Sequence, residues 1–312
     1  MANYAFGIDV GGTTVKLGLF TAEGELLDKW EIPTRTQDHG KNVLPDIAEA
    51  VRGKAKEKGF SFEDVKGVGI AVPGPVLDDG SCTVCVNLGW GHVEVAKDLS
   101  AMLDGVRVEV ANDAGAAGFG EMWKGGGRGC SNVVMVTLGT GVGGGVIVNG
   151  QNVSGAHGSA AEIGHMQVSW DETDVCNCGK KGCLEQYTSA NGIVRVARRA
   201  LKTNRIPTCL KDDENLSAKL IFDAAKEGDE FAMGQVEEFG KVLGRALAAI
   251  ATVVDPEVFV IGGGVSRAGH IVTDVVRKYY IPAAFQGCRD TGFKLAELGN
   301  DAGIYGAVKL VL

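Results

Sequence analysis

Two stretches of the chain repeat one pattern, in which an apolar run is followed by a glycine-rich tip and a second apolar run. Residues 4–20 read YAFGIDVGGTTVKLGLF, and residues 133–148 read VVMVTLGTGVGGGVIV. Neither contains the G-x-x-x-x-G-K-[ST] of a Walker loop. The second is not a dinucleotide fingerprint either, because the β-branched run 146–148 stands where that fold needs a helix. The pattern therefore predicts two β-hairpins with glycine tips, one in each half of the chain.

A glycine tip lets backbone N–H groups approach a phosphate closely, because no side chain stands in the way. Two such hairpins predict a nucleotide held between two similar domains. The alternative is that both are ordinary tight hairpins. The first tip favours the nucleotide, since it also carries Asp9, Thr13, Thr14 and Lys16.

The remaining periodicity alternates between helices and short strands, which is typical of α/β proteins. Residues 45–58 place Ile47, Val51 and Ala55 on one helical face, and residues 65–72 form an apolar strand. The other predicted helices are residues 93–103, 114–123, 192–202, 217–227, 236–254, 268–280 and 303–311, and the other predicted strands are residues 106–110 and 258–261.

The composition is that of a globular protein with room for two domains: of 312 residues, 45% are hydrophobic and 22% are charged. The net charge of −8 argues against a nucleic-acid surface. We therefore expect Trp90, Trp123 and Trp170 to pack in the protein rather than to stack on bases. The sequence contains no apolar run of about 18 residues, so it predicts no membrane span. No basic segment precedes the first strand. We expect a cytoplasmic protein that binds neither membrane nor nucleic acid.

One histidine and three cysteines lie close together in the sequence: His165, Cys176, Cys178 and Cys183. Their number and type match the ligands of a closed, tetrahedral structural zinc site. Four protein ligands leave no open position for water, so we expect no Lewis-acid chemistry from this ion. Its role would be to hold a glycine-rich loop that buries little apolar area. The alternative is four unrelated residues in a reduced core.

Five cysteines remain outside this cluster. Cys82 and Cys85 form a lone C-x-x-C with no second pair or nearby histidine, and disulfides are not expected in an intracellular chain of this length. We expect the remaining cysteines to be buried or strand residues; they are Cys82, Cys85, Cys130, Cys209 and Cys288.

Motifs along the whole chain together resemble the ROK family of bacterial sugar kinases and related repressors. The cysteine cluster beside E-I-G-H is the most specific of them. The motifs are D-V-G-G-T-T-V-K at 9–16, P-G-P at 73–75, N-L-G-W at 87–90, N-D at 112–113, L-G-T-G-V-G-G-G at 138–145, E-I-G-H at 162–165, C-x-C-G-x-x-G-C-x-E at 176–185 and G-G-G-V at 262–265.

The resemblance implies an α/β fold of the actin-like ATPase (ribonuclease H-like) type, with two domains flanking a nucleotide and sugar cleft. The smaller domain would comprise residues 1–111 with 301–312, and the larger domain, with the zinc site, residues 112–300. The resemblance also implies an ATP-dependent hexose kinase that forms a homodimer or sometimes a tetramer. The expected cofactors are Mg²⁺, bound with ATP, and the structural Zn²⁺.

Asp113 is the expected general base. It follows a predicted strand and opens a predicted helix, a place where side chains project into a cleft. Phosphoryl transfer needs a hydroxyl held in line with the γ-phosphate and a carboxylate that accepts its proton. An aspartate at a helix N-terminus keeps a low pKa, which is tolerable because positioning dominates and the proton leaves late. The alternative from spacing alone is an aspartate that only caps the helix.

The resemblance assigns the sugar hydroxyls to carboxylates, an amide and a histidine, because such groups read hydroxyls through pairs of hydrogen bonds. His165 would bind zinc through one ring nitrogen and the sugar through the other, so that the metal fixes its orientation. Asn87 and the backbone of Gly74 are weaker candidates. The full expected sugar set is Gly74, Asn87, Asn112, Asp113, Glu162, His165 and Glu185.

The resemblance likewise assigns the nucleotide to the glycine segments. Asp9 would organise Mg²⁺ through water, and Lys16 is either a phosphate contact or a solvated strand residue. The triple glycine, at a strand-to-helix turn, suits close approach of the adenosine. The expected nucleotide set is Asp9, Gly11, Gly12, Thr13, Thr14, Lys16, Gly139, Thr140, Gly141, Gly262, Gly263 and Gly264.

Glucose is the expected sugar, phosphorylated at its 6-hydroxyl to give glucose 6-phosphate and ADP in carbohydrate metabolism. Fructose, mannose, allose and N-acetylmannosamine remain alternatives, because the family's sugar-binding residues are shared among these substrates. A sugar-sensing repressor would carry a winged helix-turn-helix before the D-x-G-G-T strand, which here begins almost at the start of the sequence. An inactive sugar-binding scaffold is disfavoured by the presence of Asp113.

Overall fold

The computed structural model describes residues 3–203 and 205–312. By their internal contacts these residues group into two compact units. The first comprises the chain up to Gly129 with Gly145–Ala161 and Leu298–Leu312, and the second comprises Cys130–Gly144 and Glu162–Glu297. The predicted domains have other boundaries than these two units, and they stay a prediction. They are residues 1–111 with 301–312 and residues 112–300.

The first unit is built on a five-stranded mixed sheet with the strand order β3-β2-β1-β4-β5. The strands β1 (Tyr4–Val10), β2 (Thr14–Thr21) and β3 (Leu26–Pro33) are antiparallel neighbours. The strands β4 (Val65–Val72) and β5 (Val108–Asn112) extend the sheet parallel to β1. The carboxyl ends of β1, β4 and β5 therefore lie at one edge of the sheet.

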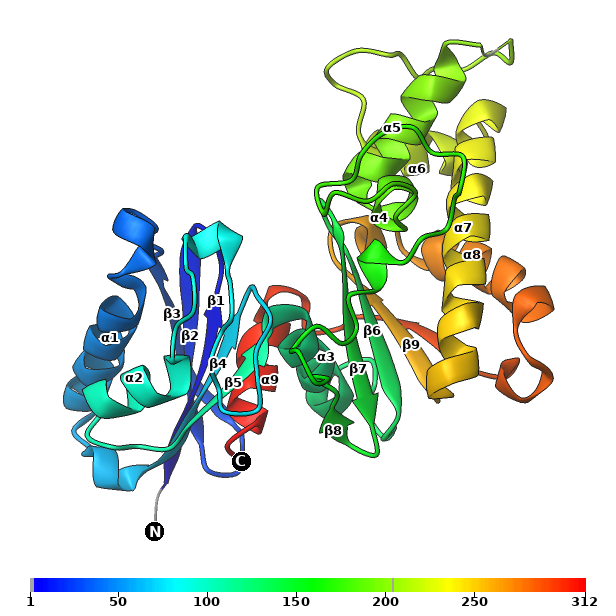
Figure 1. Cartoon of the computed structure of the whole chain (residues 1–312). Helices are drawn as coiled ribbons and strands as arrows, with labels where there is room; N and C mark the ends of the chain where they lie inside the picture. Colours follow the sequence, from blue (N-terminus) through cyan, green and yellow to red (C-terminus); the bar gives the residue numbers. More distant parts are fainter. Residues whose placement is uncertain (1–2, 204) are drawn as a thin grey trace. The chain divides into compact units, whose positions relative to one another are not determined.

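Helices cover both faces of this sheet (Figure 1). The helices α1 (Val43–Lys58) and α2 (Val95–Met102) bury their apolar faces against the valines, leucines and isoleucines of β1, β2 and β4. The helix α9 (Ala302–Lys309) packs on the other face, next to α3 (Asp113–Lys124). The core of the unit therefore joins segments from opposite ends of the sequence.

Glycines in the sheet let α9 lie directly on its backbone. A Cβ added at Gly69 would lie only 1.7 Å from the carbonyl oxygen of Ala307. At the crossing of α9 with α3, a Cβ added at Gly306 would lie 1.6 Å from the carbonyl oxygen of Ala116. Any side chain at these positions would push the helix away, so this close packing requires glycine.

The second sheet has the strand order β10-β9-β6-β7-β8, and the division between the two units falls within β7. The strands β6 (Val133–Leu138), β9 (Val258–Gly262) and β10 (Gly292–Leu295) are parallel. The strands β7 (Val142–Val148) and β8 (Gln151–Asn152) are antiparallel. The residues of β6 and β9 are almost all buried, as expected for parallel strands covered on both faces.

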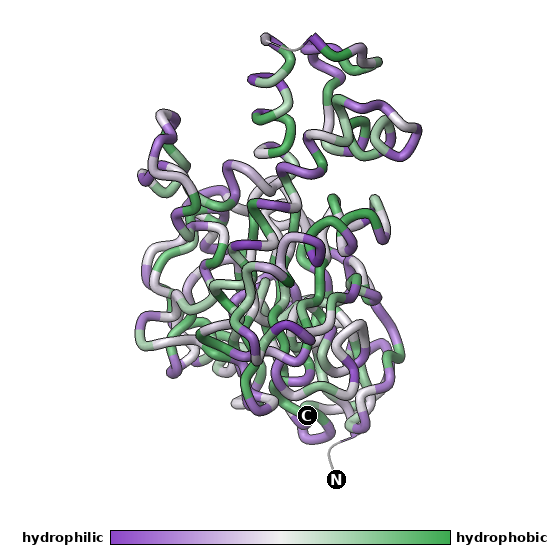
Figure 2. The backbone as a smooth tube through the Cα atoms, turned by 90° about the vertical axis from the view of Figure 1, so that its right-hand side faces the viewer, coloured by the Kyte–Doolittle hydropathy of each residue, from purple (hydrophilic) through white to green (hydrophobic). Residues whose placement is uncertain are grey.

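The described residues of the second unit form the α-helices α4 (Glu185–Thr188), α5 (Ala190–Leu201), α6 (Ala218–Lys226), α7 (Glu230–Val254) and α8 (His270–Ala283). Ser189, Ser217 and Asp229 cap α5, α6 and α7 by accepting a backbone N–H in the first turn. Hydrophobic and hydrophilic residues alternate along the helices, as expected for elements that bury one face (Figure 2). No helix within the described residues is long and apolar enough to cross a membrane.

The predicted glycine hairpins and the predicted helices are all confirmed, with shifted ends. The strand predicted at 106–110 runs from Val108 to Asn112, and the helix predicted to begin at 236 begins at Glu230, because Asp229 caps it earlier. The strands β3, β8 and β10 and the short helix α4 were not predicted. Residues of β3 alternate between exposed and half-buried at the sheet edge, so their apolar pattern is weak.

Candidate active site

The first group of candidate residues lies at the edge where β1, β4 and β5 end. The register pairs Asp9 of β1 with Ala71 of β4, and Val72 of β4 with Asn112 of β5. Asp113 then begins α3. In open α/β sheets, ligands bind beyond the carboxyl ends of parallel strands, so this edge is a favourable place for a ligand.

Asn112, rather than Asp113, provides the side-chain cap of α3. Its Oδ1 accepts hydrogen bonds from the backbone N–H groups of Ala114 at 3.0 Å and Gly115 at 3.2 Å. Its Nδ2 donates to the carbonyl oxygen of Gly74 at 3.3 Å, which leaves one amide N–H for a ligand. The Asp113 carboxylate also accepts the N–H of Ala114, at 2.8 Å.

Asp9 is a half-buried carboxylate beside the first turn of α9. A Cβ added at Gly303 would lie 2.5 Å from its Cγ, so glycine is needed here. Burial raises the pKa of Asp9 to about 6, Lys16 opposes the shift, and the charge of Asp113 adds to it. Two neighbouring carboxylates can organise a divalent cation such as Mg²⁺, whose charge would lower the pKa of Asp9.

The first glycine tip is a closed turn with free donors at its outer end. The N–H of Gly11 donates to the carbonyl oxygen of Thr14 at 3.0 Å. Thr34 braces the tip, since its hydroxyl donates to the Gly11 carbonyl at 2.7 Å and its N–H donates to the Thr13 carbonyl at 2.8 Å. Across the described residues, no hydrogen-bond acceptor is found for the N–H groups of Gly12 and Thr13, which are exposed. These N–H groups can contact an anion.

Asn87 lies next to this tip, because a Cβ added at Gly12 would be 3.9 Å from the Asn87 Cβ. Gly74 is buried, and a Cβ added there would lie 2.6 Å from the carbonyl oxygen of Val84. Lys16 donates to the carbonyl oxygen of Asn300 at 3.0 Å on the exposed surface. Its ammonium group is therefore occupied by backbone in this structure.

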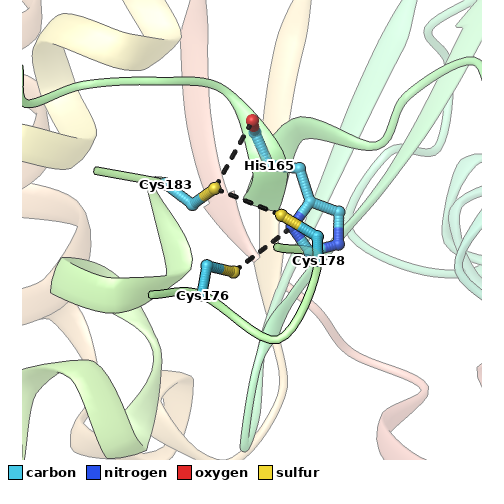
Figure 3. A group of neighbouring side chains, drawn as sticks. All are labelled: His165, Cys176, Cys178 and Cys183. Carbon is cyan, nitrogen blue, oxygen red and sulfur yellow. Dashed lines mark hydrogen bonds between the residues drawn. The ribbon is translucent and has the colours of Figure 1, made fainter. Parts of the chain in front are cut away.

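The second group of candidate residues belongs to the second unit and contains the four predicted metal ligands (Figure 3). Their ligand atoms all lie within 4.8 Å of one another. An ideal tetrahedral zinc site separates two sulfurs by about 3.8 Å and a sulfur from a nitrogen by about 3.5 Å. The Sγ atoms of Cys178 and Cys183 are 3.6 Å apart, and Cys176 Sγ is 3.8 Å from His165 Nδ1. The residues therefore fit a zinc ion, with Nδ1 as the histidine ligand.

The two candidate carboxylates of this unit differ in their surroundings. Glu185 begins α4, and its Oε1 lies 2.9 Å from Cys176 Sγ and 3.8 Å from His165 Nδ1. Glu162 is exposed and precedes the 3₁₀ turn Ile163–His165, and its carbonyl oxygen accepts the N–H of His165 at 3.1 Å. That turn is what brings the histidine back toward the cysteines.

The second glycine tip lies against Glu185. A Cβ added at Gly141 would be 2.8 Å from Glu185 Oε2. The tip is held by two backbone hydrogen bonds, from Gly139 N–H to the Gly141 carbonyl at 3.0 Å and from Ala190 N–H to the Gly139 carbonyl at 2.8 Å. Glu185 therefore lies between the metal cluster and the predicted phosphate tip.

The glycine turn after β9 lies against the end of β6. Gly263 has a φ of 85°, and a Cβ added there would be 2.5 Å from the carbonyl oxygen of Leu138. Only glycine satisfies both conditions. Residues 262–264 thus lie beside the base of the second tip, where close backbone approach is possible.

A polar pocket of about 470 Å³ opens beside these groups, within the second unit. Its lining includes the tip residues Thr140 and Gly141, the metal-cluster residue Cys176, the carboxylate of Glu185 and the guanidinium group of Arg195. The pocket is large enough for a small polar ligand.

Some expectations about packing are wrong. Trp90 is buried and donates to the Gly40 carbonyl at 3.1 Å, and Trp123 packs on Tyr305, but Trp170 is 79% exposed. Cys209 is exposed, because it lies in a loop before α6 rather than in a strand, and Cys130 is half-buried. The other three remaining cysteines, Cys82, Cys85 and Cys288, are buried as expected.

Sequence reasoning missed an ion-pair network around Glu172 in the loop that carries the cysteines. Glu172 and Asp174 pair with Arg195 and Arg199 of α5. The one signal in the sequence was the i, i+4 spacing of the two arginines, which places both on one face of a predicted helix.

These observations define a two-unit α/β protein with two glycine tips suited to phosphate and a His/Cys cluster suited to zinc. The chain belongs to the ROK family, whose model matches residues 5–312. The match confirms the resemblance seen in the motifs.

Relatives of known name lie in the same family. The chain is 41% identical over 310 residues to a glucokinase of Halalkalibacterium halodurans, covering 98% of this chain and 94% of the relative. It is 36% identical to a glucokinase of Thermotoga maritima, covering 98% and 96%. Its fold is similar to that of a ROK family glucokinase from Streptomyces griseus in complex with glucose and AMPPNP, with a TM-score of 0.76, 34% identity and 98% of each chain covered. These similarities confirm the actin-like α/β fold class.

Proposed function

We propose that this protein phosphorylates glucose at its 6-hydroxyl with ATP, giving glucose 6-phosphate and ADP. The observation that carries the proposal is the similarity to glucokinases over nearly the whole of both chains, at up to 41% identity. The solved glucokinase with glucose and AMPPNP has the same fold over 98% of this chain. The prediction of an ATP-dependent hexose kinase is confirmed by the same relatives.

Asp113 is the proposed general base, which accepts the proton of the 6-hydroxyl as the oxygen attacks the γ-phosphorus of ATP. Two features support this role. Asn112 caps two backbone N–H groups of α3, and the Ala114 N–H that Asp113 also accepts is one of them, so the helix does not depend on Asp113 alone for its cap. Asp113 also stands at the edge where three parallel strands end.

The proposed sugar ligands are Asn112, Glu162, His165 and Glu185, with Asn87 and Gly74 as further contacts. His165 presents Nδ1 to the cysteines, so Nε2 remains for a sugar hydroxyl. Asn112 has one amide N–H left to donate. Glu185 accepts hydroxyl hydrogen bonds next to the second tip.

The proposed nucleotide ligands are the two glycine tips and the turn 262–264. The exposed N–H groups of Gly12 and Thr13 would contact phosphate oxygens, with Thr14, Gly11, Gly139, Thr140 and Gly141 beside them. Asp9 would organise Mg²⁺ through water, and Lys16 would exchange its bond to Asn300 for phosphate. When bound, Mg²⁺ supplies charge neutralisation for the phosphates.

The zinc is proposed to be structural. His165, Cys176, Cys178 and Cys183 would fill all four of its positions, and it would cross-link the loop between residues 165 and 183. The chain's own residues then orient the sugar, because His165 and Glu185 are fixed at either side of the cluster.

We further propose a homodimer in the cytoplasm, on the basis of the family resemblance and of ATP as the phosphate donor. Light scattering after size-exclusion chromatography measures the assembly directly.

The test of the function is ADP release with Mg·ATP across a panel of glucose, mannose, fructose, allose and N-acetylmannosamine. A preference for glucose supports the proposal. Preference for another hexose keeps the reaction and replaces the substrate, and absence of turnover with every sugar refutes the kinase assignment.

A further inference from the structure

Glu172 is a buried carboxylate that has no part in the proposed catalysis, substrate binding or metal binding. Its side chain is 1% exposed, although it lies in the loop between His165 and Cys176. Glutamate is almost never buried to this extent unless it is paired. Its position next to the metal cluster indicates that the pairing fixes something in the site.

Charged and phenolic donors from α4 and α5 surround this carboxylate. Oε2 accepts from Tyr187 Oη at 2.7 Å, from Arg195 Nη2 at 2.8 Å and from Arg199 Nη1 at 3.2 Å. Oε1 accepts from Arg199 Nη2 at 2.9 Å. The arginines, Arg195 first, hold the pKa of the Glu172 carboxyl far below its usual value.

The same carboxylate also holds its own loop. Oε1 accepts the backbone N–H groups of Thr173 and Asp174, both at 2.9 Å. The Asp174 side chain pairs in turn with Arg195 Nη1 at 2.9 Å and with Arg199. Residues 172–174 are therefore held on α5, because the carboxylates of Glu172 and Asp174 pair with the two arginines of that helix.

This attachment continues into the metal cluster through Gln186. Its Nε2 donates to the Asp174 carbonyl at 3.0 Å, and its Oε1 accepts the N–H of Cys183 at 3.0 Å. Cys176 follows Asp174 by two residues, and its Sγ lies 2.9 Å from Glu185 Oε1. Asp174, Cys176, Glu185 and Arg195 line the same polar pocket.

Apolar burial cannot hold this loop in place. Trp170 is 79% exposed and Val175 is 62% exposed, so the two largest apolar side chains that flank Glu172 contribute little packing. A metal ion would fix the loop at His165 and at Cys176, and no member of the cluster lies between these two residues. The segment before Cys176 is held by the charges on Glu172.

We propose that Glu172, with Arg195 and Arg199, is a positioning residue that sets the place of the 172–176 loop and thereby of the Glu185 carboxylate for the hexose. The inference rests on the proposed function. It predicts a specific effect on the affinity for the sugar, because the hydrogen bonds described for Glu172 and Asp174 run to their own loop, to α4 and to α5, the elements beside Glu185.

The test is steady-state kinetics of Glu172→Gln with glucose and with ATP varied separately. The amide keeps the shape but donates where a guanidinium already donates, so a charge-assisted hydrogen bond is lost. The expected result is a KM for glucose raised by about tenfold, with the KM for ATP and kcat within about twofold of the wild type. Zinc content by mass spectrometry should stay equal to that of the wild type.

Two further variants make the result decisive. Glu237→Gln breaks an ion pair with Lys278 at 2.7 Å, between α7 and α8, and should leave both KM values unchanged. Arg199→Lys keeps the charge but not the two-pronged contact with both oxygens of Glu172, so it should raise the KM for glucose even if Glu172→Gln does not fold.

An unchanged KM for glucose in the folded variants would overturn the inference. So would an equal rise in both KM values together with a lower melting temperature, or loss of folding in both Glu172→Gln and Arg199→Lys, since these indicate a role in stability alone. If the wild type binds glucose without phosphorylating it, the proposed function fails, and calorimetric glucose affinities of the same proteins decide the inference. If the wild type does not bind glucose, both fail.

Discussion

Asn112 and Asp113 are adjacent polar residues at the start of α3, and their side chains make different sets of contacts. The amide oxygen of Asn112 accepts two N–H groups of the first turn, and the carboxylate of Asp113 also accepts one of them, that of Ala114. Burial raises the pKa of Asp9, and the charge of Asp113 adds to this shift, so the two carboxylates lie in the same small region. The proposed proton acceptor and the proposed cation ligand are therefore neighbours.

Asp113→Asn should lower kcat by about 10²–10⁴-fold, since an amide cannot accept the proton of the hydroxyl. Glucose and ATP affinities should change little, because the amide has nearly the same shape. Turnover is measured by ADP release and affinity by calorimetry. Asp78→Asn, in an exposed loop, is the control and should keep full turnover. Near-normal turnover of Asp113→Asn would remove this residue from the mechanism.

In the ligand-free protein, Asp9 makes the stability of the folded state depend on pH. Its pKa is raised from 3.8 to about 6, so the folded state binds the proton more tightly than the unfolded state. The protonated carboxyl of Asp9 makes its full contribution to the stability of the folded state below pH 3.8. This contribution is lost as the pH rises through about 6. At neutral pH the buried charge therefore destabilises the fold until a cation arrives.

Asp9→Asn should raise the free energy of unfolding of the ligand-free protein at neutral pH by about 1–2 kcal/mol, a value reduced for partial exposure. Denaturant unfolding measures it. The same variant should lose the stabilisation that Mg·ATP gives the wild type. A less stable Asp9→Asn protein at neutral pH would contradict the burial argument, and Asp78→Asn should show no change in either measurement.

At the scale of elements, the segment from His165 to Cys183 is a loop held by polar contacts alone. Short backbone bridges at Gln167–Cys183 and Val175–Lys181 fold it back on itself, and the turn at Cys176–Gly179 points the cysteines inward. Such a segment buries too little apolar surface to order itself. Its geometry therefore depends on the metal, which would bind at both ends of the segment, and on Glu172 between them.

Cys178→Ser should lose zinc and lower the melting temperature together, because the remaining three ligands bind the ion more weakly. Chelation of the wild type should produce the same two changes. Cys209→Ser is the matched control, because Cys209 is also exposed but lies outside the cluster. Full zinc content in Cys178→Ser, or none in the purified wild type, would contradict the proposed site.

At the scale of the whole molecule, the fold of the first unit depends on contacts between distant parts of the sequence. The helix α9 contributes Ile304 and Val308, and the residue Val311 that follows it, to a core shared with Ala5 and Phe20. It packs directly on the backbone of Gly7 and Gly69, so a side chain at either glycine would collide with the helix. Tight packing of this kind has large energetic consequences for single methyl groups.

Gly69→Ala should destabilise the protein by about 3 kcal/mol or more, because its methyl group would lie 1.7 Å from the Ala307 carbonyl oxygen. Gly53→Ala makes the same chemical change in α1, where nothing lies within 4 Å of the added atom. This control should instead stabilise the protein by up to about 1 kcal/mol. Thermal unfolding of both variants measures the contrast. Equal effects would show that α9 does not rest on the sheet in this way.

Much of this organisation could be predicted from local patterns. The glycine hairpins, the helix at 45–58 and the convergence of His165 with its cysteines follow from spacing alone, and the ligand atoms do lie together. The edge strand β3 and the short β10 were missed, because exposed or brief strands carry little periodicity. The Glu172 network was missed because it joins residues more than twenty positions apart, which no local pattern records.

The late position of α9 has a consequence for the protein during its synthesis. Nearly 180 residues separate the end of α3 at Lys124 from the start of α9 at Ala302. At about 5–20 residues per second, the ribosome needs roughly 10–40 s to make them. Throughout that interval the nascent first sheet exposes the apolar, glycine-lined surface that α9 later covers. The growing chain is then a natural client for chaperones that shield unfinished surfaces until the last helix emerges.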